Sequence, residues 1–84
     1  MKINPTHKYN AVTTVEKELF RSCNKYNWEG YSYIRMVWVI ICELFELIKA
    51  VVRKDQLGPH GSYFEAAQVS ACCQKMMIEI QRRS

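Results

Sequence analysis

The chain has 84 residues, of which 49% are hydrophobic and 24% charged. This composition is that of a globular protein, and the length provides for one small domain, residues 1–84. The composition excludes a disordered chain, and the length excludes a two-domain protein. The longest apolar run, Met36 to Cys42, has seven residues, whereas a membrane span needs about 20, so we expect no membrane-spanning segment.

The charge is mildly basic, with 12 Lys and Arg against 8 Asp and Glu and a net charge of +4. The excess is spread along the chain, and its densest points are Arg53-Lys54 and Arg82-Arg83. A nucleic-acid-binding face needs basic residues gathered on one surface, so this distribution argues against nucleic acid as the partner. A small anionic ligand such as a nucleotide suits the charge better.

The cysteines predict reduced thiols rather than a disulfide scaffold or a zinc site. Their spacing contains no CxxC pair, and neither His7 nor His60 has ligand-like spacing to a cysteine. Residues 1–15 contain no apolar run, so we expect no signal peptide and a cytoplasmic protein. The four cysteines are Cys23, Cys42, Cys72 and Cys73.

Residues 1–12 are expected to form an extended N-terminal arm, because Pro5 and Asn10 disfavour a helix. The sequence from Thr13 to Glu16 has the pattern of a capping box. A first, amphipathic helix is therefore predicted from there to about Tyr26.

A second helix is predicted from about Ser32 to Lys54, after a connector that contains Trp28 and Gly30. Its residues are apolar almost all round. Such a helix is buried in a bundle or in an oligomer, so this segment predicts that copies of the chain associate as a homodimer or homotetramer.

A turn over residues 55–61 separates the second helix from a third. The sequence from Ser62 to Glu65 is a second capping-box pattern, and the third helix is predicted to run to about Arg82. The fold class expected is all-α: a small bundle of about three helices, completed by oligomerisation. The face expected to be buried on the third helix consists of Phe64, Val69, Cys72, Met76 and Ile80.

Two pairs of polar residues interrupt the apolar helices. Glu43 and Glu46 stand at i and i+3 within the most apolar segment, and Glu65 and Gln68 repeat that spacing on the third helix. If these two helices are antiparallel neighbours, both pairs line one pocket. Because unpaired buried carboxylates are costly, we expect a hard divalent cation there, Mg²⁺ or Mn²⁺. The alternative reading pairs Glu46 with Lys49 on the surface and makes Glu65 a cap partner of Ser62.

The stretch from Cys42 to Asp55, CELFELIKAVVRKD, resembles the signature of the MazG-like all-α nucleoside triphosphate pyrophosphohydrolases. That signature has paired glutamates, then an apolar residue, a Lys-Ala pair and a charged turn with Asp. The stretch from Glu65 to Cys72, EAAQVSAC, is similar to the second helix motif of phage-type members. The resemblance covers about residues 34–80.

The resemblance implies that Glu43, Glu46 and Glu65 are the catalytic, Mg²⁺-binding carboxylates. Gln68 stands where many members have a fourth carboxylate, an aspartate, and is the fourth expected metal ligand. Phe45 replaces a common glycine. The reaction implied is attack of water, activated by the ion, on the α–β phosphate linkage of a (deoxy)nucleoside triphosphate, which gives a monophosphate and pyrophosphate.

Four further residues are candidates for holding the nucleotide. Lys49 and Arg53 follow Glu46 by three and seven positions, and with Lys54 they are expected to contact phosphate oxygens. The alternative is that they are solvated charges near a helix C-terminus. Trp28 is a candidate for stacking on the base or for packing in the core.

Two other functions are consistent with the sequence. Because Gln68 carries no charge, one is a catalytically inactive MazG-like module that binds a nucleotide or a protein and regulates. The other is a small basic nucleic-acid-binding regulator, against which the scattered charge argues.

Overall fold

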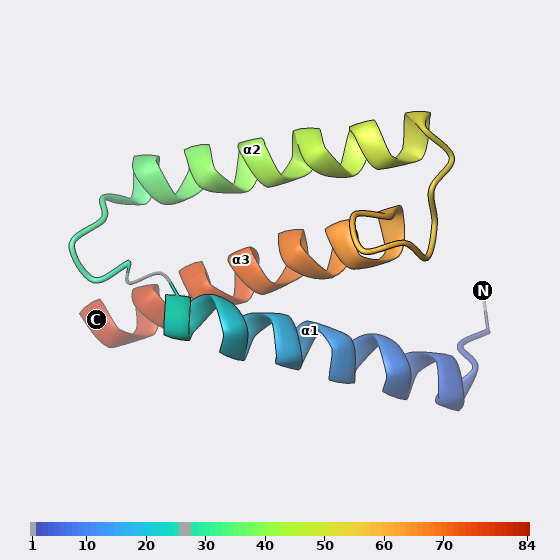
Figure 1. The fold of residues 1–84 in the computed structure, drawn as a ribbon. Helices are drawn as coiled ribbons and strands as arrows, with labels where there is room; N and C mark the ends of the chain where they lie inside the picture. The colour runs from blue at the N-terminus through green and yellow to red at the C-terminus, as the bar shows by residue number, and fades with distance from the viewer. Residues whose placement is uncertain (1, 26–27) are drawn as a thin grey trace.

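The computed structural model describes residues 2–25 and 28–84, which form three helices and, within these ranges, no strand. They are α1 (Pro5–Lys25), α2 (Tyr33–Val52) and α3 (Ser62–Arg83) (Figure 1). The predicted small all-α fold is confirmed. The predicted end of the first helix at Tyr26 lies outside the described residues.

Helix α1 begins at Pro5, so the prediction of an extended arm over residues 1–12 is wrong. The Asn4 side-chain oxygen accepts hydrogen bonds from the backbone N–H groups of Thr6 (2.9 Å) and His7 (3.3 Å). Asn is a preferred N-cap, and Pro is favoured at the first helical position because it lacks the N–H that would go unsatisfied there. The Asn4-Pro5 pair is therefore the start signal, and Thr13 lies inside the helix.

Helix α2 has the predicted bounds to within two residues. Its N-cap is Ser32, whose hydroxyl oxygen accepts from the backbone N–H of Arg35 (3.2 Å). At the other end, Lys54 adopts a left-handed backbone with φ of 60°, which ends the helix.

Helix α3 starts at Ser62 as predicted, but not through a capping box. Its N-cap is Gly61, which has no side chain to cap with, so the predicted role of Ser62 is wrong. A Cβ on Gly61 would lie 2.7 Å from the backbone carbon of Gln56. The tight loop thus requires glycine at the cap and leaves the Glu65 carboxylate available for other contacts.

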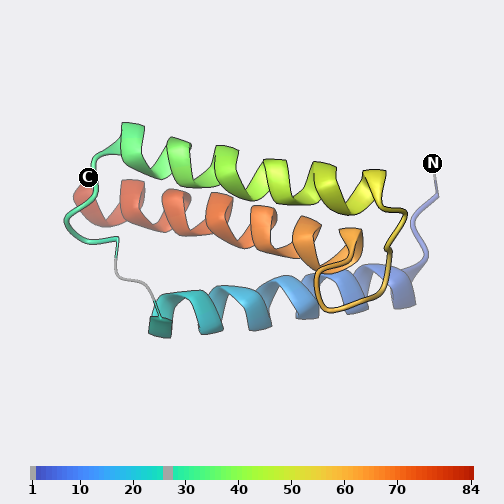
Figure 2. The same cartoon turned by 45° about the horizontal axis from the view of Figure 1, so that its top comes forward.

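Helix α3 is the centre of the bundle. It packs against both α1 and α2, whereas among the described residues α1 and α2 do not pack against each other. Figures 1 and 2 show α3 between the other two helices. The small buried core consists of Trp28, Met36 and Cys72, with Tyr31, Val39, Ile40 and Met76 packed around it.

Two cations in the C-terminal half of α3 hold the end of the bundle where α1 ends and α2 begins. Lys75, which is buried, donates from Nζ to the carbonyl (3.2 Å) and hydroxyl (3.0 Å) oxygens of Ser22 near the end of α1. Arg83 donates to the carbonyl oxygens of Trp28 (3.2 Å) and Tyr31 (2.6 Å) in the connector before α2. Both tie α3 to segments more than 50 residues earlier in the chain.

The prediction that α2 is buried on all sides is not met by the single chain. Only Met36 and Ala50 of this helix are buried, and its outer face exposes large apolar side chains along its whole length. The predicted buried face of α3 is also only partly correct, because Ile80 is exposed while Cys72 is buried. In the described ranges no helix has the length and apolarity required to cross a membrane.

Candidate functional site

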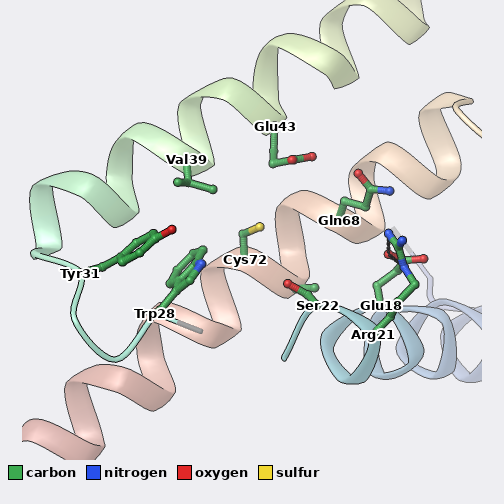
Figure 3. Close-up of a pocket in the computed structure, with 10 residues that line it drawn as sticks. Glu18, Arg21, Ser22, Trp28, Tyr31, Val39, Glu43, Gln68 and Cys72 are labelled. Atoms are coloured by element: carbon green, nitrogen blue, oxygen red, sulfur yellow. Dashed lines mark hydrogen bonds and ion pairs between the residues drawn. The ribbon is translucent and has the colours of Figure 1, made fainter. Parts of the chain in front are cut away.

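A cavity of about 380 Å³ occupies the groove that α1 and α2 leave open over α3. Figure 3 shows side chains from all three helices and from the connector around it. This volume is in the range of small-molecule sites. The lining residues are Glu18, Arg21, Ser22, Trp28, Tyr31, Val39, Glu43, Gln68, Ala71 and Cys72.

Glu43 from α2 and Gln68 from α3 lie close together at one end of this cavity (Figure 3). Exchanging the oxygen and nitrogen of the Gln68 amide, which have the same shape, lets the nitrogen donate to Glu43 Oε2 (3.0 Å) and to Glu65 Oε2 (3.3 Å). The amide then bridges carboxylates of two helices. Three of the four residues predicted to line one pocket, Glu43, Glu65 and Gln68, therefore come together, although Glu65 does not line this cavity.

The Glu43 carboxyl is in an unfavourable place for a negative charge. Burial raises its pKa above the ordinary value, and the nearby negative charges of Glu65 and Glu46 raise it further. Arg21, across the groove on α1, acts in the opposite direction. A cation bound here would relieve the repulsion among these carboxylates.

Glu65 lies in the first turn of α3 and is buried, with 4% of its surface exposed. The partial positive charge of a helix N-terminus favours a carboxylate there. His60, in the loop before α3, brings its Nδ1 to 3.6 Å from Glu65 Oε1. The imidazole itself is largely exposed, so it covers the buried carboxylate from the solvent side.

Glu46 does not join this cluster. Its carboxylate forms an exposed ion pair with Lys49 on the same helix (3.2 Å), which is the alternative reading of the sequence for this residue. Within residues 2–25 and 28–84, no three His, Cys, Asp or Glu side chains come close enough together to hold a metal ion. The donors present together are two carboxylates and one amide.

The opposite end of the cavity is aromatic. Trp28 is buried and stacks on Tyr31, with ring centroids 6.0 Å apart and planes 11° from parallel. Lys75 Nζ lies 4.6 Å from the centroid of the Trp28 ring, and Arg35 lies over Tyr31. Trp28 thus belongs both to the core and to the cavity wall, so packing in the core and stacking on a base are compatible roles for it.

The three predicted phosphate-binding cations do not line the cavity. Lys49 pairs with Glu46, and Arg53 donates to the carbonyl oxygen of His60 (3.3 Å). Lys54 lies at the turn that ends α2. All three are exposed, near the loop that leads to Glu65, so a phosphate contact remains a prediction for them.

The sequence analysis missed the contribution of α1 to the cavity. Arg21 and Ser22 follow Glu18 by about one turn on the face of α1 that meets the groove. Arg21 donates to Glu18 Oε2 (2.9 Å). Their i, i+3, i+4 spacing would place them on one face, but no motif marks them, and only the packing of α1 on α3 brings that face to the cavity.

Comparison of the chain with protein-family models, with curated proteins and with solved structures finds no match. Membership of the MazG-like family therefore remains a prediction that rests on the motifs between residues 34 and 80.

Proposed function

We propose that the protein is a Mg²⁺-dependent nucleotide pyrophosphohydrolase that cleaves a (deoxy)nucleoside triphosphate to its monophosphate and pyrophosphate. The observation that carries the proposal is the convergence of Glu43 and Glu65 on Gln68, beside a cavity with an aromatic wall. The resemblance of residues 34–80 to MazG-like enzymes supports the same reading. With it we infer a phage-type protein of the bacterial cytosol.

The oxygen donors at this cluster are of the kind that a hard cation binds, although the amide carries no charge. Two carboxylates and an amide oxygen are ligands that Mg²⁺ and Mn²⁺ accept, with water completing the shell. Glu43 and Glu65 would hold the ion, with Gln68 turned to present its oxygen, and Glu46 would have to release Lys49 to join them. When bound, the ion would neutralise phosphate charge and polarise the attacking water.

The proposed hydrolysis needs one water molecule and a base to accept its proton. The oxygen of a water molecule bonds to the α-phosphorus, the bond from that phosphorus to the α–β bridging oxygen breaks, and pyrophosphate leaves. The proton from the water needs a base. Because Glu43 and Glu65 would hold the ion, we assign that role to a carboxylate oxygen of this cluster that the ion leaves free.

The nucleotide would lie with its base toward Trp28 and Tyr31 and its phosphates toward Glu43. A flat base gains contact area on the edge of this stacked pair. The phosphates would then extend toward the end of α2 that carries Lys49, Arg53 and Lys54.

Association of copies is part of the proposal. The open groove and the exposed α2 face leave more accessible surface uncovered than a chain of this size usually leaves. A homodimer, or a tetramer built from two such dimers, would cover the α2 face and leave the groove open.

A product assay tests the enzymatic proposal. The purified protein is incubated with each common NTP and dNTP and Mg²⁺ or Mn²⁺, and monophosphate is separated from diphosphate. We expect monophosphate and pyrophosphate, and a loss of at least about a hundredfold in Glu43→Gln and Glu65→Gln. Glu16→Gln, an exposed glutamate on α1, is the matched control. Diphosphate as product, or equal rates in all variants, would contradict the proposal.

A second candidate function is a nucleotide- or protein-binding regulatory module without turnover. The pairing of Glu46 with Lys49 and the neutral side chain at Gln68 favour it, because both reduce the charge available to a cation. Nucleotide binding that requires Mg²⁺, with no product from any substrate, would identify this function.

A further inference from the structure

One face of α2 carries a regular apolar pattern that the single chain leaves uncovered. Ile34, Ile41 and Ile48 repeat every seven residues, and Val37, Leu44 and Val51 repeat in the same way three residues later. These six residues, here called the α2 stripe, are between 36% and 84% exposed. Their spacing is that of the a and d positions of a coiled coil, sustained over the length of the helix.

The whole chain exposes more surface than a compact monomer of its mass. The accessible surface of the chain is 6490 Å², about 1,300 Å² more than the ~5,200 Å² typical of a folded monomer of this mass. The radius of gyration, 13.7 Å, likewise exceeds the roughly 12 Å typical of this length. A standard interface takes about 800 Å² from each partner.

We propose that the α2 stripe binds the α2 stripe of a second copy, antiparallel, about a two-fold axis between Ile41 and Leu44. In that register each stripe residue meets an apolar partner residue of the other class. Ile34 lies against Val51 of the second copy, Val37 against Ile48, and Ile41 against Leu44. The pattern is complementary to itself under the two-fold operation, as an interface between identical copies requires.

The helix dipoles favour the antiparallel direction over the parallel one. A parallel pair would align the two helix dipoles and bring like ends together, whereas an antiparallel pair opposes the dipoles. The side-chain charges are nearly balanced at both ends, because Lys49, Arg53 and Lys54 stand against Glu46 and Asp55 at the C-terminal end and Arg35 stands at the N-terminal end.

Two aromatic residues extend the stripe along one edge. Trp38 and Phe45 are seven residues apart and are 64% and 59% exposed. In an antiparallel pair, residues at this heptad position flank the seam beside their equivalents in the partner. Trp38 of one copy then approaches Phe45 of the other, twice by symmetry, which buries the largest exposed side chain of α2.

This inference rests on the association of copies proposed above but not on catalysis, and mass in solution tests it first. We expect the wild-type chain at about 100 µM to sediment at twice its monomer mass. Ile41→Glu places unpaired carboxylates at the centre of the seam and should raise the dissociation constant at least about a hundredfold. Phe20→Glu, at an apolar residue of α1 that is 75% exposed against 36% for Ile41, is the control and should remain dimeric.

Cross-linking tests the direction, and stays informative if Ile41→Glu fails to fold. In a chain with Cys23, Cys42 and Cys73 replaced by Ser, Arg35→Cys and Lys49→Cys are introduced in separate chains. If the pair is antiparallel, a short bismaleimide should cross-link the Arg35→Cys chain to the Lys49→Cys chain when the two are mixed. Neither chain should cross-link to itself when it is incubated alone.

Three results would overturn the proposal. The first is a wild-type chain that is monomeric at 100 µM, and the second is a dimer that Ile41→Glu leaves intact. The third is cross-linking of each single-cysteine chain to itself, because that result indicates a parallel pair. Binding of a monomeric chain to anionic lipid vesicles, lost in Ile41→Glu, would assign the stripe to a membrane surface instead.

Discussion

Cys72 and Cys73 are adjacent in sequence but have opposite surroundings. Cys72 is buried beside Glu43, and burial first, with the Glu43 charge second, raises the pKa of its thiol to about 11. Cys73 points outward and is exposed. At pH 8 only about one Cys72 thiol in a thousand is then a thiolate, the form that reacts.

We therefore expect iodoacetamide at pH 8 to modify Cys73 at least about a hundred times faster than Cys72. Fragment-ion mass spectrometry of the peptide that holds both residues measures the two rates. Urea should abolish the difference. Equal rates in the folded protein would show that Cys72 is not enclosed by α2 and α3.

The Glu43 carboxyl makes stability depend on pH. Its folded pKa lies above the ordinary value of 4.5 because of burial and then the charges of Glu65 and Glu46. The stability linked to its protonated form is thus fully present below pH 4.5 and is lost as the pH rises through the folded pKa. Ionised Glu43 opposes folding at neutral pH.

We expect Glu43→Gln, which keeps an oxygen to accept from Gln68, to raise the melting temperature at pH 7 and to match the wild type at pH 4. Thermal unfolding at the two pH values measures this, with Glu16→Gln as the exposed control. A lower melting temperature at pH 7 without divalent cations would contradict the assigned environment of Glu43.

At the scale of the helices, the sequence predicts α2 and α3 well because their signals are local. Ser32 at the N-cap, the apolar run and the loop with Gly58 and Gly61 each act within a few residues. The sequence does not predict the start of α1, because Pro5 is unfavourable inside a helix, whereas directly after Asn4 it occupies the first helical position.

The candidate site is predictable only where helical spacing brings residues together. Glu43, Glu65 and Gln68 were found because two i, i+3 pairs on antiparallel neighbours must meet. The contribution of Glu18 and Arg21 depends on how α1 packs on α3, which no local pattern reports. Glu46 was placed in the cluster because i+3 shares a face, but its side chain turns to Lys49 instead.

The N-cap of α1 provides a test at this scale. Asn4→Ala removes the acceptor for the N–H groups of Thr6 and His7 and should lower the free energy of unfolding by about 1 kcal/mol. Asn10→Ala, an exposed position inside the same helix, should be neutral or slightly stabilising. Urea unfolding compares them; equal effects would place the start of α1 elsewhere.

The connection between α3 and α1 depends on Lys75. Its ammonium donates to two oxygens of Ser22 and lies over the Trp28 ring. Lys75→Ala should therefore lower the free energy of unfolding by about 1.5–3 kcal/mol. Lys17→Ala, exposed on α1, should change it by less than about 0.5 kcal/mol. A similar small effect for both would show that the Lys75 contacts are not stabilising.

At the scale of the whole molecule, the central position of α3 accounts for both the open groove and the exposed face of α2. Because α3 is central and α1 and α2 do not pack together in the described ranges, a groove remains over α3 with the carboxylates along its side. The same arrangement leaves the outer face of α2 uncovered. A second copy on the α2 stripe would cover that face and leave the groove open to ligand.

The enzyme and the inactive binding module share one central claim, that the Glu43–Gln68–Glu65 cluster binds a divalent cation. Titration with Mn²⁺, followed by the loss of the electron paramagnetic resonance signal of the free ion, tests it directly. We predict saturable binding that weakens at least about tenfold in Glu43→Gln and in Glu65→Gln, is unchanged in Glu16→Gln, and tightens in Gln68→Glu. No saturable binding, or binding that the cluster variants leave unaltered, would contradict the claim.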